Sequence, residues 1–188
     1  MATFGRTNED ASSFALVDGR KYVIKYNLPV QGSVSRMDAF VENDEGSDIT
    51  AFRLVIYGPD LVDTPLALAL VAVTPDITIP SAQTEPAWTG AALAAPVQLQ
   101  PGDYWIGFHS GVNTANPVIR GTALGGANIL KGTSAGDAFT GGASNPWAEV
   151  VDVNVDRALD IYATYTPIAG HPLKLSRRYR HRKAQYLR

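Results

Sequence analysis

The sequence predicts an all-β protein, an antiparallel β-sandwich of jelly-roll type. About eight to ten short segments alternate apolar with polar side chains or are rich in β-branched and aromatic residues, as strands are. The 188 residues include 17 glycines and 12 prolines, which supply turns between such segments. The body of the chain has no convincing amphipathic helix. Many short strands separated by turns are typical of sandwiches and jelly rolls.

The segment Leu99–Gly111 is the most strand-like part of the chain, and the other strands are expected to be arranged around it. It begins with Pro101-Gly102-Asp103, a turn in which proline presets one dihedral and glycine accepts a positive φ. One set of side chains then alternates with another: Tyr104, Ile106 and Phe108 against Trp105, Gly107 and His109. Nearly all of them are apolar or small, which predicts a central strand covered on both faces.

Further strands are expected on both sides of this segment. Alternation or β-branched and aromatic content predicts them at Tyr22–Leu28, Ser33–Val41, Ile49–Tyr57, Ile77–Ile79, Leu93–Gln100, Glu149–Val155 and Ala158–Thr166. The apolar run Leu66–Thr74 is bounded by prolines and is too short for a helix. Residues 110–145 are rich in glycine and asparagine and predict long loops with one or two short strands. Such long loops are usually functional or held by a neighbour.

Composition excludes several classes of protein. There is no cysteine, so neither a disulfide framework nor a thiolate metal site exists. The apolar runs Leu66–Val73 and Ala91–Val97 are too short to span a bilayer, and no basic segment followed by an apolar one suggests a secretory signal. We therefore expect a chain made in the cytoplasm that does not insert into a membrane.

The net charge of −2 conceals a division of the chain into an acidic body and a basic end. All 18 acidic residues precede Pro167, whereas seven of the 16 basic residues follow it. These are Lys174, Arg177, Arg178, Arg180, Arg182, Lys183 and Arg188. We therefore expect two units: a sandwich over residues 1–167 and a basic C-terminal arm over residues 168–188.

The arm has three possible roles. Arginine side chains pair carboxylates through two parallel hydrogen bonds, so docking on an acidic protein surface is the preferred interpretation. Clustered basic residues also bind nucleic acid by releasing counterions from phosphates, and Tyr179 could stack on a base. Leu175, Tyr179 and Tyr186 or Leu187 stand near helical spacing among the charges. A solubilising tail without a partner is the third role.

Catalysis is not expected from the motifs. Of the three histidines, His171 and His181 lie in the arm and His109 has no partner at metal-ligand spacing. There is no Gly-x-Ser-x-Gly sequence and no cysteine nucleophile. The glycine-rich stretches 121–126 and 132–142 lack the strand and helix of a phosphate-binding loop. The sequence thus predicts no cofactor and no metal site. Two of the acidic side chains could still lie close together in the fold, as the carboxylate pair that cleaves a glycosidic bond does.

The acidic segment Glu42–Asp48 offers oxygen atoms that could bind calcium, which takes six to eight of them. Its spacing lacks the alternating acids and closing glutamate of an EF-hand loop. A solvated hairpin loop is therefore the preferred interpretation.

Aromatic residues outside the evident strands are candidates for stacking on a sugar ring. Trp88 and Trp147 are both flanked by turn residues, and the amide of Asn145 could bond a hydroxyl group next to Trp147. Trp105 is expected in the core. The alternative for Trp88 and Trp147, and the preferred one, is that each closes one end of the sandwich under a loop.

Framework residues of the body resemble a family of jelly-roll modules found in tailed-bacteriophage virion proteins and related bacterial surface proteins. The resemblance is carried by Phe4-Gly5, Tyr26-Asn-Leu-Pro29, Gly32-Ser-Val34, Leu54-Val-Ile-Tyr57, Leu99-Gln-Pro-Gly-Asp-Tyr-Trp-Ile-Gly107 and Ile161-Tyr-Ala-Thr-Tyr-Thr-Pro167. It covers most of residues 1–167 and none of the arm.

The resemblance implies a non-catalytic module that serves adhesion, carbohydrate contact or virion decoration. Together with the charge division, it predicts a structural or accessory virion protein, a capsid decoration or minor tail component assembled in the host cytoplasm. Its partners would be other virion proteins held through the arm, and a homo-oligomer is expected. The alternative function is a carbohydrate-binding module that recognises cell-surface glycans.

Overall fold

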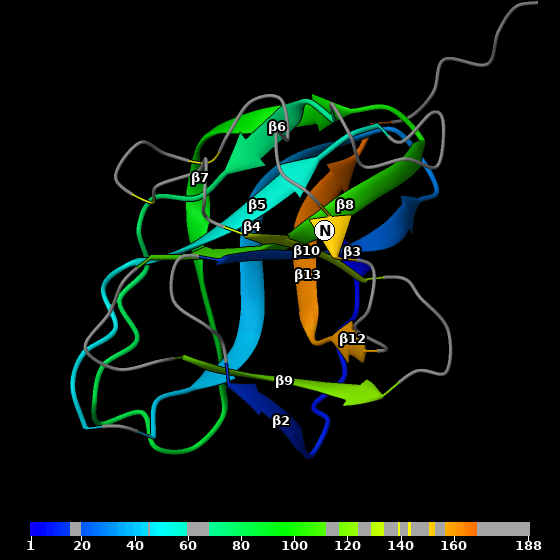
Figure 1. The fold of residues 1–188 in the computed structure, drawn as a ribbon. Helices are drawn as coiled ribbons and strands as arrows, with labels where there is room; N and C mark the ends of the chain where they lie inside the picture. The colour runs from blue at the N-terminus through cyan, green and yellow to red at the C-terminus, as the bar shows by residue number, and fades with distance from the viewer. Residues whose placement is uncertain are drawn as a thin grey trace, which may run out of the picture.

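A computed structural model describes residues 1–15, 20–44, 46–59, 68–111, 117–123, 129–133, 139, 143, 151–152 and 157–168. Within these residues the regular structure is β, and the strands form two antiparallel sheets that pack face to face (Figure 1). The prediction of an all-β chain is confirmed. The described part of the chain contains no helix long and apolar enough to cross a membrane.

The first sheet, sheet A, has seven strands within the described residues. Its order is β1 (Ala2–Gly5), β13 (Ile161–Pro167), β4 (Gly32–Glu42), β9 (Val118–Ala123) and β12 (Arg157–Leu159). Two further strands lie off this path: β2 (Ser12–Ala15) pairs with β9, and β7 (Ala87–Leu99) pairs with β4.

The second sheet, sheet B, has six strands within the described residues. Its order is β11 (Val151–Asp152), β10 (Ile129–Thr133), β3 (Arg20–Leu28), β8 (Gly102–Ser110), β5 (Phe52–Tyr57) and β6 (Leu70–Val73). β8 lies between β3 and β5, and its residues from Tyr104 to Ser110 are all buried. The predicted central strand is therefore confirmed.

The main core lies between the sheets and follows the period-two alternation of the strands. On β4 the inward side chains are Val34, Met37, Ala39 and Val41, all fully buried. Phe52, Leu54 and Ile56 of β5 and Ile106 and Phe108 of β8 face them from sheet B. This alternation leaves the intervening side chains on the outer faces.

The outer face of sheet B carries a second apolar cluster, in which Trp105 is 4% exposed, so its predicted burial is confirmed. The other buried members are Val23, Val55, Tyr57 and Leu68, with Ala143 packed against them. Beside this cluster, Lys21, His109 and Arg53 lie in one row across β3, β8 and β5.

Four expected strands differ from the observed ones, and one of them, Ile49–Tyr57, begins only at Phe52, as β5. Ile77–Ile79 forms only an isolated bridge, through hydrogen bonds between Ile79 and Ile49, so the predicted strand there is wrong. β7 begins at Ala87, six residues before the predicted start at Leu93. The predicted strand Ala158–Thr166 is divided at Asp160 into β12 and β13.

Candidate functional site

Three half-buried aromatic side chains meet on the outer face of sheet A, and we call them the outer aromatic cluster: Phe40, Trp88 and Tyr162. The ring centroids of Phe40 and Trp88 are 5.1 Å apart, and those of Trp88 and Tyr162 are 4.8 Å apart. The three residues come from β4, β7 and β13, which lie side by side with β4 in the middle.

The strand register explains why these rings face outward together. Phe40 stands between the inward Ala39 and Val41, so its side chain projects to the opposite face. Trp88 lies directly opposite Phe40 in the β4–β7 pair. Tyr162, which follows the buried Ile161, lies opposite Asp38 in the β13–β4 pair.

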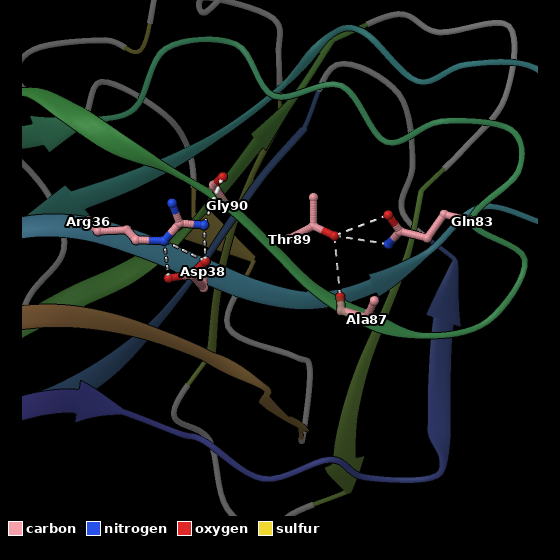
Figure 2. A network of polar contacts seen from close by, with 6 residues as sticks. All are labelled: Arg36, Asp38, Gln83, Ala87, Thr89 and Gly90. Carbon is pink, nitrogen blue, oxygen red and sulfur yellow. Dashed lines mark hydrogen bonds and ion pairs between the residues drawn. The ribbon is translucent and has the colours of Figure 1, made fainter.

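Charged side chains border the cluster. The Trp88 Nε1–H donates to Oε1 of Glu9 over 3.0 Å. Arg36 donates from Nε and Nη2 to the Asp38 carboxylate over 2.7–2.9 Å, and Nη2 also reaches the Gly90 carbonyl oxygen at 3.2 Å (Figure 2). The hydrogen bond to Asp38 raises the pKa of Arg36. Burial, followed by the negative charge of Asp38, raises the pKa of the Tyr162 hydroxyl.

A second polar network fixes the start of β7 (Figure 2). The Gln83 Nε2 donates to the Val41 carbonyl oxygen over 2.8 Å and to the Thr89 hydroxyl over 2.9 Å. The Thr89 hydroxyl also lies 3.4 Å from the Ala87 carbonyl oxygen, which it can reach as a donor. Because Ala87 and Thr89 flank Trp88, this network holds the indole in place over β4.

Gly90 lets β7 approach β4 closely beside the cluster. A Cβ atom at this position would lie 2.0 Å from the Met37 carbonyl oxygen and 2.7 Å from Cα of Asp38. Both atoms belong to the backbone and cannot rotate away. In the neighbouring ion pair the Asp38 side chain is only 6% exposed, whereas the Arg36 side chain is 46% exposed.

A polar cleft of 420 Å³ is lined in part by Gly5, whose strand partner is Tyr162. Its lining residues are Gly5, Arg6, Thr7, Asn8, Ile24, Lys25, Tyr26 and Ala158. The Tyr26 hydroxyl donates to the Leu159 carbonyl oxygen over 2.9 Å, and burial raises its pKa. Arg6, Thr7 and Asn8 of the lining directly precede Glu9, which accepts the hydrogen bond from Trp88.

The arrangement is suited to binding a polyhydroxylated ligand. Aromatic faces pack on the apolar face of a pyranose ring, while carboxylates and a guanidinium bond its hydroxyl groups. The bordering groups are two carboxylates, of Glu9 and Asp38, and one guanidinium, of Arg36.

Among the predicted glycan-contact residues, the structure describes Trp88 alone. It lies within β7 on an outer sheet face, so the expectation that turns flank it on both sides is wrong. Trp147 and Asn145 lie outside the described residues, and so do Lys174, Arg177, Arg178, Tyr179, Arg180, Arg182, Lys183 and Arg188. Sequence reasoning missed Phe40, Tyr162 and Glu9, because only the strand register brings them to Trp88.

The acidic segment 42–48 is not a solvated loop throughout. Glu42 belongs to β4, is buried, and pairs with Arg120. Asn43 is also buried and donates to the Ser47 carbonyl oxygen over 2.7 Å. The Ser81 N–H donates to Asp48 over 2.8 Å and lowers the pKa of that carboxyl. Within the described residues, no group of three or more His, Cys, Asp and Glu side chains could hold a metal ion.

No protein-family model matches the chain, and a search of curated proteins found no significant match.

Proposed function

We propose that this chain is a non-catalytic structural or accessory virion protein of a bacteriophage, a capsid decoration or minor tail component. It would consist of a jelly-roll sandwich attached to the particle by the basic arm of residues 168–188. The observation that carries the proposal is the charge division, in which every acidic residue lies before the arm. An arm that binds carboxylates on neighbouring subunits would leave the acidic sandwich facing outward.

The strand pairing supports the jelly-roll part of the proposal. In a jelly roll of eight strands, the first pairs with the last, the second with the seventh, the third with the sixth, and the fourth with the fifth. The corresponding pairs here are β1–β13, β3–β8, β4–β7 and β5–β6, all antiparallel. The contacts β13–β4 and β8–β5 then join these pairs into two sheets. On this interpretation β2 and β9–β12 are additions.

Removing residues 168–188 is expected to weaken binding to purified particles by about tenfold or more, because the Arg–carboxylate contacts are lost. Co-sedimentation of the parent and the truncated chain with virions of the source phage, at low and high salt, measures this. A variant with Arg177, Arg178, Arg180 and Arg182 replaced by Gln keeps the arm length and should lose binding similarly. Equal binding of the parent and the truncated chain would show that the arm is not the anchor.

A second function, binding of cell-surface glycans, is favoured by the outer aromatic cluster. Aromatic side chains on a flat outer sheet face expose ring surface, and fixed polar groups beside them give specificity. Here the cluster spans three neighbouring strands and carries Glu9, Asp38 and Arg36 at its border. In a multivalent assembly, weak contacts of this kind would add up to strong adhesion.

Trp88→Ala is expected to weaken glycan binding by about tenfold or more, because a central aromatic side chain contributes most to such a contact. The measurement is an array of neutral and acidic oligosaccharides, followed by calorimetry with one that binds. Val30→Ala is the control, because Val30 is 44% exposed and is not part of the cluster. If Trp88→Ala binds as well as the parent with its circular dichroism unchanged, the cluster does not bind the glycan.

A further inference from the structure

The segment that follows β1, from Arg6 to Asp10, is held at both ends by one carboxylate, that of Asp160. Oδ1 of Asp160 accepts a hydrogen bond from Nε of Arg6, and Oδ2 accepts one from the N–H of Asp10, each over 2.8 Å. Nε and Nη2 of Arg6 also donate to Oδ2 of Asp10. The middle of the segment, Thr7 to Glu9, is exposed, so its position depends on these fixed ends.

Segment 6–10 reaches the outer aromatic cluster through Glu9. The Trp88 Nε1–H donates to Oε1 of Glu9 over 3.0 Å, and among the residues that the structure describes this is the one hydrogen bond of the Glu9 side chain. The Gln83 side chain fixes the backbone next to Trp88 by bonding the Thr89 hydroxyl. A charged acceptor at Nε1 adds a restraint on rotation of the indole itself, because such hydrogen bonds are strong and directional. The orientation of the ring therefore depends on where Glu9 lies.

The backbone of Asp160 is joined to the same cluster. Its carbonyl oxygen accepts a hydrogen bond from the Phe40 N–H over 2.9 Å, and it lies two positions before Tyr162 at the corner between β12 and β13. The Asp160 side chain is fully buried. A buried ion pair contributes little net stability relative to apolar residues, but it fixes the geometry of the groups that it joins. At this corner the groups so fixed are those that lead to Trp88.

We infer that Asp160 is a positioning residue of the outer aromatic cluster, which holds Glu9 where it orients the Trp88 indole. The consequence for ligand binding rests on the proposed glycan function, since a ligand that stacks on a ring already fixed does not have to order it. The orientation of the indole is a property of the free protein and is measured without a ligand.

The ¹H–¹⁵N resonance of the Trp88 indole, assigned with Trp88→Phe, tests the inference, because a proton bonded to a carboxylate is deshielded. Glu9→Ala removes the acceptor and gives the position of the signal without this bond. Asp160→Asn removes the charge at nearly constant size and is expected to move the signal by about half of that displacement or more. An unchanged signal in folded Asp160→Asn would overturn the inference.

Glu42→Gln is the matched control, because Glu42 is also a buried carboxylate of sheet A but pairs with Arg120. It should leave the indole signal in place. Equal displacements in Glu42→Gln and Asp160→Asn would mean that the loss of any buried ion pair moves the indole, which would also overturn the inference.

The double variant shows whether Asp160 acts through Glu9. In a chain that already carries Glu9→Ala, Asp160→Asn should cause no further displacement of the indole signal. A second displacement as large as the first would contradict this route. Should Asp160→Asn fail to fold, Arg6→Gln provides the readout, because it releases one end of the segment and leaves Asp160 in place. Its signal should move in the same direction as in Glu9→Ala, and an unchanged signal would count against the inference.

Calorimetry with the oligosaccharide selected on the array measures the consequence for binding. Asp160→Asn should weaken the affinity by about fivefold or more, because the ligand must then order the indole. A displaced indole signal with the affinity of the parent would overturn the role of Asp160 in binding. If no oligosaccharide of the array binds the parent chain, the proposed glycan function fails, whereas the indole signal still decides whether Asp160 positions Trp88.

Discussion

Gly107→Ala is expected to lower the free energy of unfolding by about 3 kcal/mol. Gly107 lies in β8, opposite Val23 of β3 and Val55 of β5. A Cβ atom there would lie 1.7 Å from the Tyr22 carbonyl oxygen and 2.6 Å from Cα of Val23. Both atoms are backbone of a paired strand, so β3 would have to move away from β8. Urea unfolding followed by circular dichroism measures the loss.

Gly46→Ala separates this steric effect from the effect of backbone conformation. Gly46 has a φ of +71°, and a Cβ atom there would meet nothing within 4 Å. Alanine at this position is therefore destabilised only by the left-handed backbone conformation, which lowers the free energy of unfolding by about 1 kcal/mol. If Gly107→Ala proves no more destabilising than Gly46→Ala, β3 and β8 do not approach as closely as described.

The strands that the sequence reveals are those with strong alternation of large side chains. β3, β4, β5 and β8 were predicted because their β-branched and aromatic residues recur at every second position. The start of β7 was missed because Ala87–Ala92 is built mainly of small residues, and it is a strand because β4 pairs with it. Ile77–Ile79 has the right side chains but forms only an isolated bridge with Ile49 and a single backbone hydrogen bond to Phe52, without a continuous ladder. Pairing therefore overrode local preference in both cases.

The candidate site was only partly predictable for a related reason. A tryptophan outside the evident core marked Trp88 as a candidate for ligand contact. Phe40 and Tyr162, however, are separated from it by 48 and 74 positions in the sequence. They reach it only because β4 pairs with β7 on one side and β13 on the other. That pairing arises from the fold as a whole, and alternation within one strand carries no information about it.

Asp160→Ala is expected to cost about 3 kcal/mol of stability, because the substitution removes a buried partner of a charged network. The Asp160 side chain is fully buried, at the corner between β12 and β13. It accepts hydrogen bonds from Arg6 Nε and from the Asp10 N–H, each over 2.8 Å. These contacts tie residues 6–10 to sheet A, and Glu9 of that segment bonds Trp88. Thermal and urea unfolding measure the loss.

Arg6→Ala and the double variant show how much of the cost belongs to the ion pair. If the two charges act as a pair, the double variant should be more stable than the sum of the single losses implies, by about 1–3 kcal/mol.

The pH dependence of the free energy of unfolding tests the opposing contribution of burial, which raises the pKa of the Asp160 carboxyl. A raised pKa means that the carboxyl stabilises the fold most below its unfolded value of 3.8 and less as the pH rises through the folded value. The stability gap between the parent and Asp160→Ala should therefore narrow as the pH increases from 3.8. A gap that widens instead would mean that pairing with Arg6 outweighs the cost of burying the charge.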